Sequence, residues 1–214
     1  MIRIPVFTRR YLPLVIIALL ATAAGYGAYQ ANQPTVPQMP GFFWPNPRVI
    51  SAFELDATKD TILNTERLQD KWTFLFFGYT FCPDVCPTTL STMANVVKLL
   101  EDQQRAEDIQ VVFVSVDPAR DNIEHMTKYV SYFNESFIGA TAPLEQLDSL
   151  TGQLGIAHFR DSPDETGNYH VDHTASIILI DPKLRYLGLF GTPHSASTIA
   201  SQFLEIKNFM KAQS

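Results

Sequence analysis

The feature that most constrains the fold is a cysteine pair directly after a strongly apolar run. Residues 72–77 read Trp-Thr-Phe-Leu-Phe-Phe, and aromatic residues in such a run are typical of a buried strand. Gly78 ends the run, and Pro83 can open the helix that follows. The chain of 214 residues has two cysteines, Cys82 and Cys86. Both therefore lie where a buried strand passes into a helix.

The four-residue spacing of the cysteines limits what they can do. On a helix it brings two side chains to one face, with Cα atoms roughly 6 Å apart. That separation suits a disulfide or a shared soft metal ion. A purely structural disulfide gains little here, because so short a loop contributes only about 2 kcal/mol in the chain-entropy model. A chain of this length also builds a core without such a bridge. We therefore expect chemistry at this pair.

Predicted strands and helices alternate along the rest of the chain. Apolar runs predict strands at 47–55, 109–116, 137–140, 174–180 and 186–190. Helical spacing and capping signals predict helices at 88–104, 121–133, 141–154 and 195–211. This alternation predicts an α/β fold, a mixed sheet flanked by helices. In thioredoxin-like folds of this pattern the active site lies at the first strand-to-helix turn, where the cysteines are found. Their spacing is one residue longer than in the usual redox motif, which favours a shared metal.

A histidine beside a later strand is the candidate third ligand. Two thiolates alone hold a divalent metal poorly, and His173 directly precedes the predicted strand core at 175–180. In a thioredoxin-like fold the loop before that strand faces the active-site helix, so His173 can complete a Cys2His site. Taken alone, a histidine in such a loop is more often a surface residue. Two thiolates and one imidazole suit Cu(I) or Zn²⁺, and Cu(II) would take a fourth donor from Asp172, His170 or water.

The segment after the second long strand holds further candidates. Asp117 and Arg120 lie in a loop at a strand end, where functional residues gather in α/β sheets. They either flank the site and tune the thiols, or shape a turn in which Arg120 pairs with a nearby carboxylate. Asp121, with Glu124 three residues later, predicts a capping box for the next helix.

The N-terminal segment predicts a membrane anchor. Residues 11–29 contain no charged residue and are just long enough to cross a bilayer. Arg9 and Arg10 precede them, which by the positive-inside rule keeps residues 1–10 in the cytoplasm. Residues 30–47 form a proline-rich spacer, and the functional domain occupies residues 48–214 on the outer side. A cleaved signal peptide is the alternative, because Ala21-Thr-Ala23 resembles a cleavage site.

The charge of the remaining chain excludes one class of partner. Apart from the three N-terminal arginines, 13 basic residues stand against 22 acidic ones, a formal charge of −9. Such an acidic body does not suggest nucleic acid as a partner.

Three stretches together resemble the signature motifs of the Sco/SenC family. They are residues 78–87 (Gly-Tyr-Thr-Phe-Cys-Pro-Asp-Val-Cys-Pro), 115–121 (Ser-Val-Asp-Pro-Ala-Arg-Asp) and 171–174 (Val-Asp-His-Thr). The resemblance covers residues 45–210, and the anchor and spacer agree with it. It implies a thioredoxin-like copper protein of the bacterial inner membrane, with a single span and a periplasmic domain. It also implies that Cys82, Cys86 and His173 are the metal ligands.

The resemblance implies a carrier without turnover of its own, that is, no enzyme. Its cargo is copper, as Cu(I) and/or Cu(II), and it helps build the dinuclear copper centre of cytochrome c oxidase subunit II. The implied partners are that subunit, a copper donor protein, a thiol reductant and the membrane. The alternative is a thiol-disulfide oxidoreductase that reduces the cysteines of the oxidase site, with Cys82 and Cys86 as its redox pair. His173 discriminates between the two, because disulfide exchange needs only the thiols. A peroxidase-like enzyme has no support beyond the fold.

Overall fold

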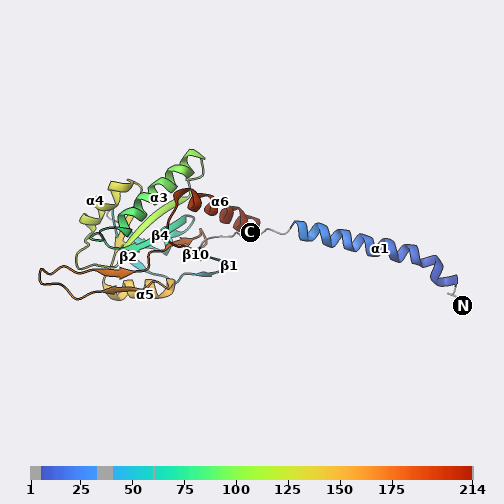
Figure 1. Cartoon of the computed structure of the whole chain (residues 1–214), viewed down its shortest axis with the longest axis horizontal. Helices are drawn as coiled ribbons and strands as arrows, with labels where there is room; N and C mark the ends of the chain where they lie inside the picture. The colour runs from blue at the N-terminus through green and yellow to red at the C-terminus, as the bar shows by residue number, and fades with distance from the viewer. Residues whose placement is uncertain (1–5, 33–40, 60, 214) are drawn as a thin grey trace. The chain divides into compact units, whose positions relative to one another are not determined.

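The computed structural model describes residues 6–32, 41–59 and 61–213, and contacts divide the chain into two units (Figure 1). The smaller unit contains helix α1 (Val6–Ala31). Within α1, the 21 residues Tyr11–Ala31 have a mean hydropathy of 1.8. They are long and apolar enough to cross a membrane, a property that signal sequences share. The proline-rich run at 33–40 lies outside the described residues.

The larger unit is built on one eight-stranded sheet with the order β1-β10-β9-β4-β5-β6-β2-β3. The strands are β1 (Gly41–Val49), β2 (Glu54–Ala57), β3 (Thr61–Asn64), β4 (Trp72–Gly78), β5 (Ile109–Ser115), β6 (Ile138–Thr141), β9 (Ile177–Ile180) and β10 (Arg185–Phe190). Strands β4, β5 and β6 run parallel, and the other pairs are antiparallel. Every residue of β4 is buried, as expected of a central strand covered on both faces.

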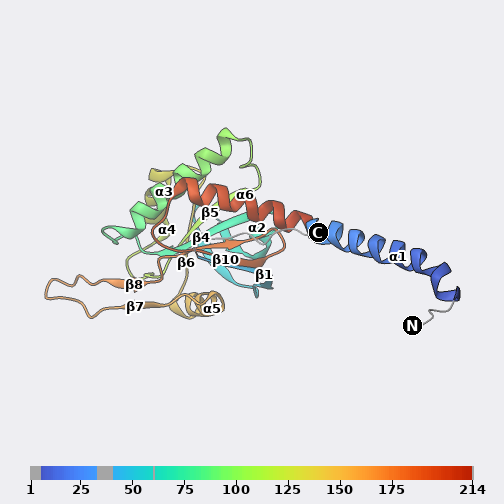
Figure 2. The ribbon, with the colours of Figure 1, turned by 45° about the vertical axis from the view of Figure 1, so that its right-hand side comes forward.

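Helices cover both faces of the sheet. Figures 1 and 2 place α3 (Val85–Asp102), α4 (Ile123–Phe133) and α6 (Ala196–Ala212) on one face and α5 (Leu144–Leu154) on the other. A single turn, α2 (Thr65–Leu68), precedes β4. The ring of Phe203 in α6 packs on Trp72 and Phe74 of β4, with centroids 5.4 and 5.1 Å apart. The predicted α/β fold, a mixed sheet flanked by helices, is confirmed.

A two-stranded ribbon forms a second, separate sheet. Strands β7 (His158–Arg160) and β8 (Val171–His173) pair antiparallel, with His158 opposite His173. In Figure 2 the ribbon and its connecting loop extend away from the main sheet. Sequence patterns did not predict these strands, because three residues are too few to show alternation.

The predicted first strand at 47–55 is wrong. Two strands replace it, because β1 pairs with β10 near one edge of the sheet while β2 pairs with β6 and β3 near the other. The chain crosses between these positions at residues 50–53, so no single strand can include both parts. Strand β1 begins at Gly41, ahead of the predicted domain start at residue 48. Proline is tolerated in β1 because it is an edge strand.

The predicted cap of α4 is also wrong. Asn122, not Asp121, caps this helix, and its side-chain oxygen accepts a hydrogen bond from the His125 amide at 2.9 Å. Asp121 is fully buried and bonds instead to the loop that leads to the cysteines, as described below.

Candidate metal centre

The junction between β4 and α3 positions the two thiols. Helix α3 begins at Val85, so Cys86 lies in its first turn while Cys82 lies in the preceding turn. Both cysteines therefore lie at the predicted strand-to-helix junction, but only Cys86 is on the helix, so their separation is not that of two helical residues. The reason is a turn, in which the Cys82 amide donates to the Tyr79 carbonyl at 3.2 Å, with Pro83 directly after it. The fold of this turn brings the Cys82 Sγ to 3.5 Å from the Cys86 amide, which donates to it.

Gly78 provides the space that Cys86 occupies. A Cβ atom at position 78 would lie 2.6 Å from the Cys86 Sγ and 2.8 Å from a ring carbon of Phe113. The sulfur therefore lies directly against the backbone of β4. Cys86 is fully enclosed, whereas Cys82 retains 9% of its surface. The two thiols thus differ in access to solvent.

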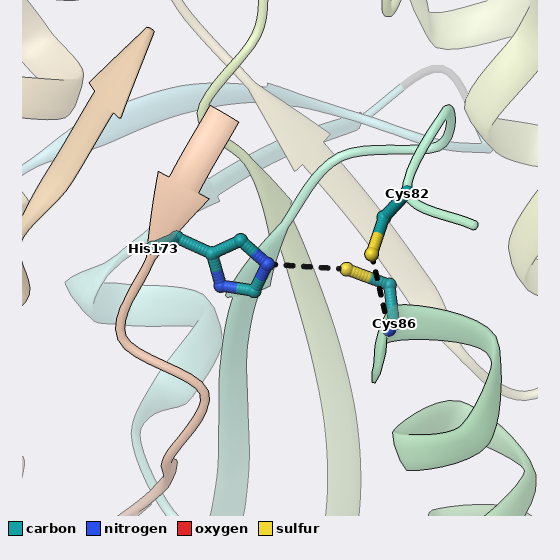
Figure 3. A group of neighbouring side chains, drawn as sticks. All are labelled: Cys82, Cys86 and His173. Atoms are coloured by element: carbon teal, nitrogen blue, oxygen red, sulfur yellow. Dashed lines mark hydrogen bonds between the residues drawn. The ribbon is translucent and has the colours of Figure 1, made fainter. Parts of the chain in front are cut away.

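His173 reaches the thiols from the end of β8. Figure 3 shows the imidazole pointing toward Cys86, and its Nε2 atom lies 3.4 Å from the Cys86 Sγ. Phe76 and Tyr79 hold the imidazole edge-on, with ring centroids 5.9 and 6.0 Å away. The Nδ1 atom lies 3.3 Å from the Thr174 carbonyl, which accepts a hydrogen bond when the proton is on Nδ1. The Nε2 lone pair then faces the sulfurs, as a metal ligand requires.

The three predicted ligands form one compact group. The sulfurs of Cys82 and Cys86 and a ring nitrogen of His173 all lie within 4.8 Å of one another. Both cysteines are free thiols. Two sulfurs and one imidazole are a donor set that suits Cu(I). The structure therefore brings together the residues that the sequence singled out.

A surface depression leads to the group. It has a volume of about 320 Å³, and Cys82, Asp84, His170 and His173 are among the residues that line it. His170, one of the fourth donors considered for Cu(II), thus lines the depression and does not belong to the compact group. The depression gives an incoming group access to Cys82 and His173, whereas Cys86 stays enclosed.

The two thiols have opposite electrostatic environments. The Cys86 thiol donates to the Cys82 sulfur and lowers the pKa of Cys82 to about 3, and contacts with His173 and nearby backbone add to this effect. The same sulfur contact, together with burial, raises the pKa of Cys86 well above its ordinary value. The pair therefore holds one proton between two sulfurs. A bound metal ion replaces that proton, because a coordinating thiol is deprotonated.

Asp121 anchors the loop before the cysteines. This fully buried carboxylate accepts hydrogen bonds from the Thr80 amide at 2.9 Å, from the Ser115 hydroxyl at 2.5 Å and from the Thr80 hydroxyl. The bonds tie the start of the cysteine loop to the end of β5. Sequence reasoning missed this role, although Ser115 and Asp121 belong to one of the signature stretches.

Asp117 and Arg120 form the pair that sequence reasoning considered. The Arg120 Nε lies 2.5 Å from Asp117 Oδ2, so the prediction that Arg120 pairs with a nearby carboxylate is confirmed. Arg120 Nη1 also donates to the Tyr169 carbonyl at 3.0 Å, and the Tyr169 hydroxyl donates to Asp117 Oδ1 at 2.7 Å. Tyr169 was not predicted, because its contacts depend on the course of a long loop.

Fold and site together define a class of protein. The class is that of α/β proteins with a mixed sheet and a Cys2His group at a strand-to-helix junction. The sequence profile described as SCO1/SenC matches residues 45–208. The chain therefore belongs to the SCO1/SenC family, as its motifs indicated.

Similar proteins agree with this assignment. A putative copper-binding protein of Stutzerimonas stutzeri is 40% identical over 138 residues, 64% of this chain and 67% of that protein. A SCO2-like protein of Rickettsia prowazekii is 31% identical and covers 88% of this chain and 94% of its own length.

Solved structures resemble this one closely. ScoI of Bradyrhizobium japonicum with copper bound has a TM-score of 0.66 at 28% identity, over 76% of this chain and 99% of that one. ScoI of Arabidopsis thaliana with copper bound has a TM-score of 0.69 at 27% identity, over 75% of this chain and 99% of that one. The predicted thioredoxin-like fold is confirmed.

Proposed function

We propose that this protein is a membrane-anchored copper carrier whose cargo is held by Cys82, Cys86 and His173. The observation that carries the proposal is the convergence of the three donor atoms within 4.8 Å. Thiolates select Cu(I), and imidazole suits copper in either oxidation state. Copper-bound structures of similar proteins support this choice of metal.

The proposed recipient is the dinuclear copper site of cytochrome c oxidase subunit II, in line with the role of the family. Three donors leave Cu(I) room for a further ligand, and the depression beside Cys82 gives an incoming cysteine access. Copper then passes by ligand exchange, without net oxidation or reduction. The proposed partners are subunit II, a copper donor protein and a thiol reductant.

The proposed location is the bacterial inner membrane. Residues 1–10 face the cytoplasm, 11–29 cross the bilayer, the spacer ends before Gly41, and the periplasmic domain extends from β1 at Gly41 to residue 214. The apolar stretch of α1 and the arginines before it support this orientation.

The electrostatics of the thiols favour the carrier over the alternative thiol-disulfide reductase. A thiolate with a low pKa stabilises the dithiol form, so the corresponding disulfide is oxidising and the dithiol is a weak reductant. Both sulfurs then stay available to a metal. Disulfide exchange also gives His173 no role as a ligand.

Copper titration of the reduced full-length chain in detergent tests the proposal. We expect one copper per chain, and a thiolate charge-transfer band with Cu(II). His173→Ala should lose most of the Cu(II) affinity and keep weaker Cu(I) binding through the sulfurs. His125→Ala, at an exposed histidine stacked on Phe81, is the control and should match the wild type. An unchanged Cu(II) spectrum in His173→Ala would remove that residue from the site.

Delivery needs a separate test. The copper-loaded chain is mixed with the apo copper-binding domain of subunit II, and the absorption spectrum of the dinuclear centre is followed. Its appearance supports delivery, and its absence while copper stays bound to the chain would refute delivery alone.

A further inference from the structure

The ribbon that carries His173 has little support of its own. Strands β7 and β8 have three residues each, and they form a sheet separate from the main one. An isolated two-stranded ribbon is at best marginally stable in water. Residues 161–168 of the connecting loop are all exposed. Contacts from outside the ribbon must therefore fix His173 opposite the thiols.

Arg120 supplies such a contact just before β8. Its guanidinium carbon lies 3.6 Å from the centre of the Tyr169 ring, which is a stacked arrangement. Its Nη1 atom donates a hydrogen bond of 3.0 Å to the carbonyl of the same tyrosine. Arg120 thus holds both the ring and the backbone of Tyr169.

Asp117 fixes Arg120 in this position. The carboxylate is only 2% exposed, and its Oδ2 lies 2.5 Å from Arg120 Nε. Its Oδ1 accepts a hydrogen bond of 2.7 Å from the Tyr169 hydroxyl. Each of the three residues therefore contacts the other two. We call Asp117, Arg120 and Tyr169 the Arg120 clamp.

We propose that the Arg120 clamp is a positioning device for His173, which holds β8 so that the imidazole meets the two thiols. The inference rests on the proposed function, in which His173 is a copper ligand. Tyr169 precedes His173 by four residues, and Val171 between them is 4% exposed, so β8 is fixed at two points. Arg120 lies outside the compact group of donors. Besides Tyr169 it contacts the rings of Tyr79 and Phe81 in the loop before Cys82, with its guanidinium carbon 5.5 and 5.0 Å from their centres, so Tyr169→Phe is the variant that isolates the contact with the ribbon.

The two oxidation states of copper should depend on the clamp differently. Cu(I) is held mainly by the two thiolates, which belong to the β4–α3 junction. Cu(II) depends more on the imidazole, which the clamp places. Loss of the clamp should therefore lower the Cu(II) affinity more than the Cu(I) affinity.

The chain offers a matched control for Arg120. Arg185 Nη2 lies 2.5 Å from Asp181 Oδ2, and that aspartate is also 2% exposed. Ile180, the neighbour of Asp181, pairs with Thr73 near the start of β4, whereas the cysteines follow the other end of this strand. Replacing either arginine leaves a buried aspartate without its cation, which destabilises the fold. Only the Arg120 pair contacts the loop that leads to His173.

The test compares Arg120→Met, Arg185→Met and Tyr169→Phe in the reduced full-length chain in detergent. Affinities for Cu(II) and Cu(I) are measured by competition with chelators, and pulsed EPR of the Cu(II) form measures the coupling to imidazole nitrogen. We expect Arg120→Met to lower the Cu(II) affinity by about 10- to 100-fold and to weaken the nitrogen coupling, because such supporting residues have effects of this size. Tyr169→Phe should also lower the Cu(II) affinity and weaken the nitrogen coupling, but by less than Arg120→Met. Arg185→Met should keep the wild-type ratio of the two affinities.

The possible outcomes each support or overturn the role of the Arg120 clamp. An Arg120→Met chain that folds and keeps the wild-type ratio and nitrogen coupling overturns the clamp, as does an equal change in Arg185→Met. If Arg120→Met does not fold, a wild-type ratio in Tyr169→Phe overturns it. A wild-type chain that binds no copper, or shows no imidazole coupling, refutes the proposed ligand set and this inference with it. That failure is visible before any variant is compared.

Discussion

At the scale of single residues, two cysteines four positions apart have opposite surroundings. Cys82 keeps some contact with solvent and carries the charge of the pair, whereas Cys86 is enclosed between β4 and α3 and holds the proton. The environment, and not the side-chain chemistry, makes them different. This difference predicts which thiol reacts first.

Cys82 should be alkylated before Cys86 in the reduced chain without metal. Alkylation requires an accessible thiolate, and Cys82, which is 9% exposed and lines the depression, is the more accessible of the two. Because the pKa of Cys82 is lowered to about 3, its reaction with iodoacetamide should hardly slow from pH 8 to pH 5. An ordinary thiol would slow by about tenfold per pH unit over this range. Peptide mass mapping at each pH checks this, and equal modification of both cysteines would contradict it.

Gly78 should not tolerate a side chain. The added methyl group of Gly78→Ala would overlap Cys86 and Phe113, so the sulfur must move. We expect a loss of about 1–3 kcal/mol in the free energy of unfolding, as for other overpacked sites, and weaker copper binding.

The control is Gly152→Ala in α5. A Cβ atom there meets nothing within 4 Å, and alanine favours a helix, so stability should stay the same or rise. Chemical denaturation and copper titration measure both variants. A Gly78→Ala chain with wild-type copper affinity would show that Cys86 does not need this space.

The proposed ligands were predictable from sequence because each lies in a short motif beside a strong strand. Gly78 and Tyr169 were not predicted as supports of the site. Their importance depends on what faces them across the fold, which local sequence does not encode.

At the scale of elements, the buried strands and the long helices follow from local pattern. The apolar run at β4 predicts a strand, and the helical spacing of apolar residues in α3 predicts a helix. The ribbon, the short β2–β3 hairpin and the cap of α4 do not follow, since they depend on partners from other parts of the chain. The element that presents His173 is therefore among the least predictable.

His194 should couple the stability of this region to pH. Burial lowers its pKa, and a hydrogen bond to the Phe190 carbonyl only partly opposes this effect. Its Nδ1 also lies 3.2 Å from the Thr89 hydroxyl of α3. The unfolded chain therefore binds a proton near pH 6.5 that the folded chain does not, so this contribution to stability is lost as pH falls below about 6.5.

His194→Gln removes this titration and keeps hydrogen-bonding groups. Between pH 7 and pH 5 its free energy of unfolding should fall less than that of the wild type, as measured by urea denaturation. His125→Gln, at an exposed site, is the control and should follow the wild type. Identical pH profiles for His194→Gln and the wild type would contradict the account.

At the scale of the whole molecule, sequence patterns did not predict the order of the strands in the sheet. The pairing of β1 with β10 joins the two ends of the larger unit, and β2 returns to the opposite side of the sheet. Such pairings are set by burial across the whole sheet. The alternation of elements predicted the α/β class but not this order.

Oxidation of the two cysteines should prevent tight copper binding without changing the fold. A disulfide between Cys82 and Cys86 closes a very short loop and adds only about 2 kcal/mol to stability. A disulfide sulfur cannot replace a thiolate as a ligand. Oxidised and reduced chains should thus share nearly the same circular dichroism, while only the reduced chain binds copper tightly. Equal copper affinity in the two forms would rule out both cysteines as ligands.

X-ray absorption at the copper edge tests the central claim most directly. The claim is that Cys82, Cys86 and His173 form one copper site. The reduced full-length chain loaded with one Cu(I) should show two sulfur neighbours and one imidazole nitrogen, and His173→Ala should lose the nitrogen shell. A wild-type spectrum with sulfur neighbours alone, or with a single sulfur, would contradict the account.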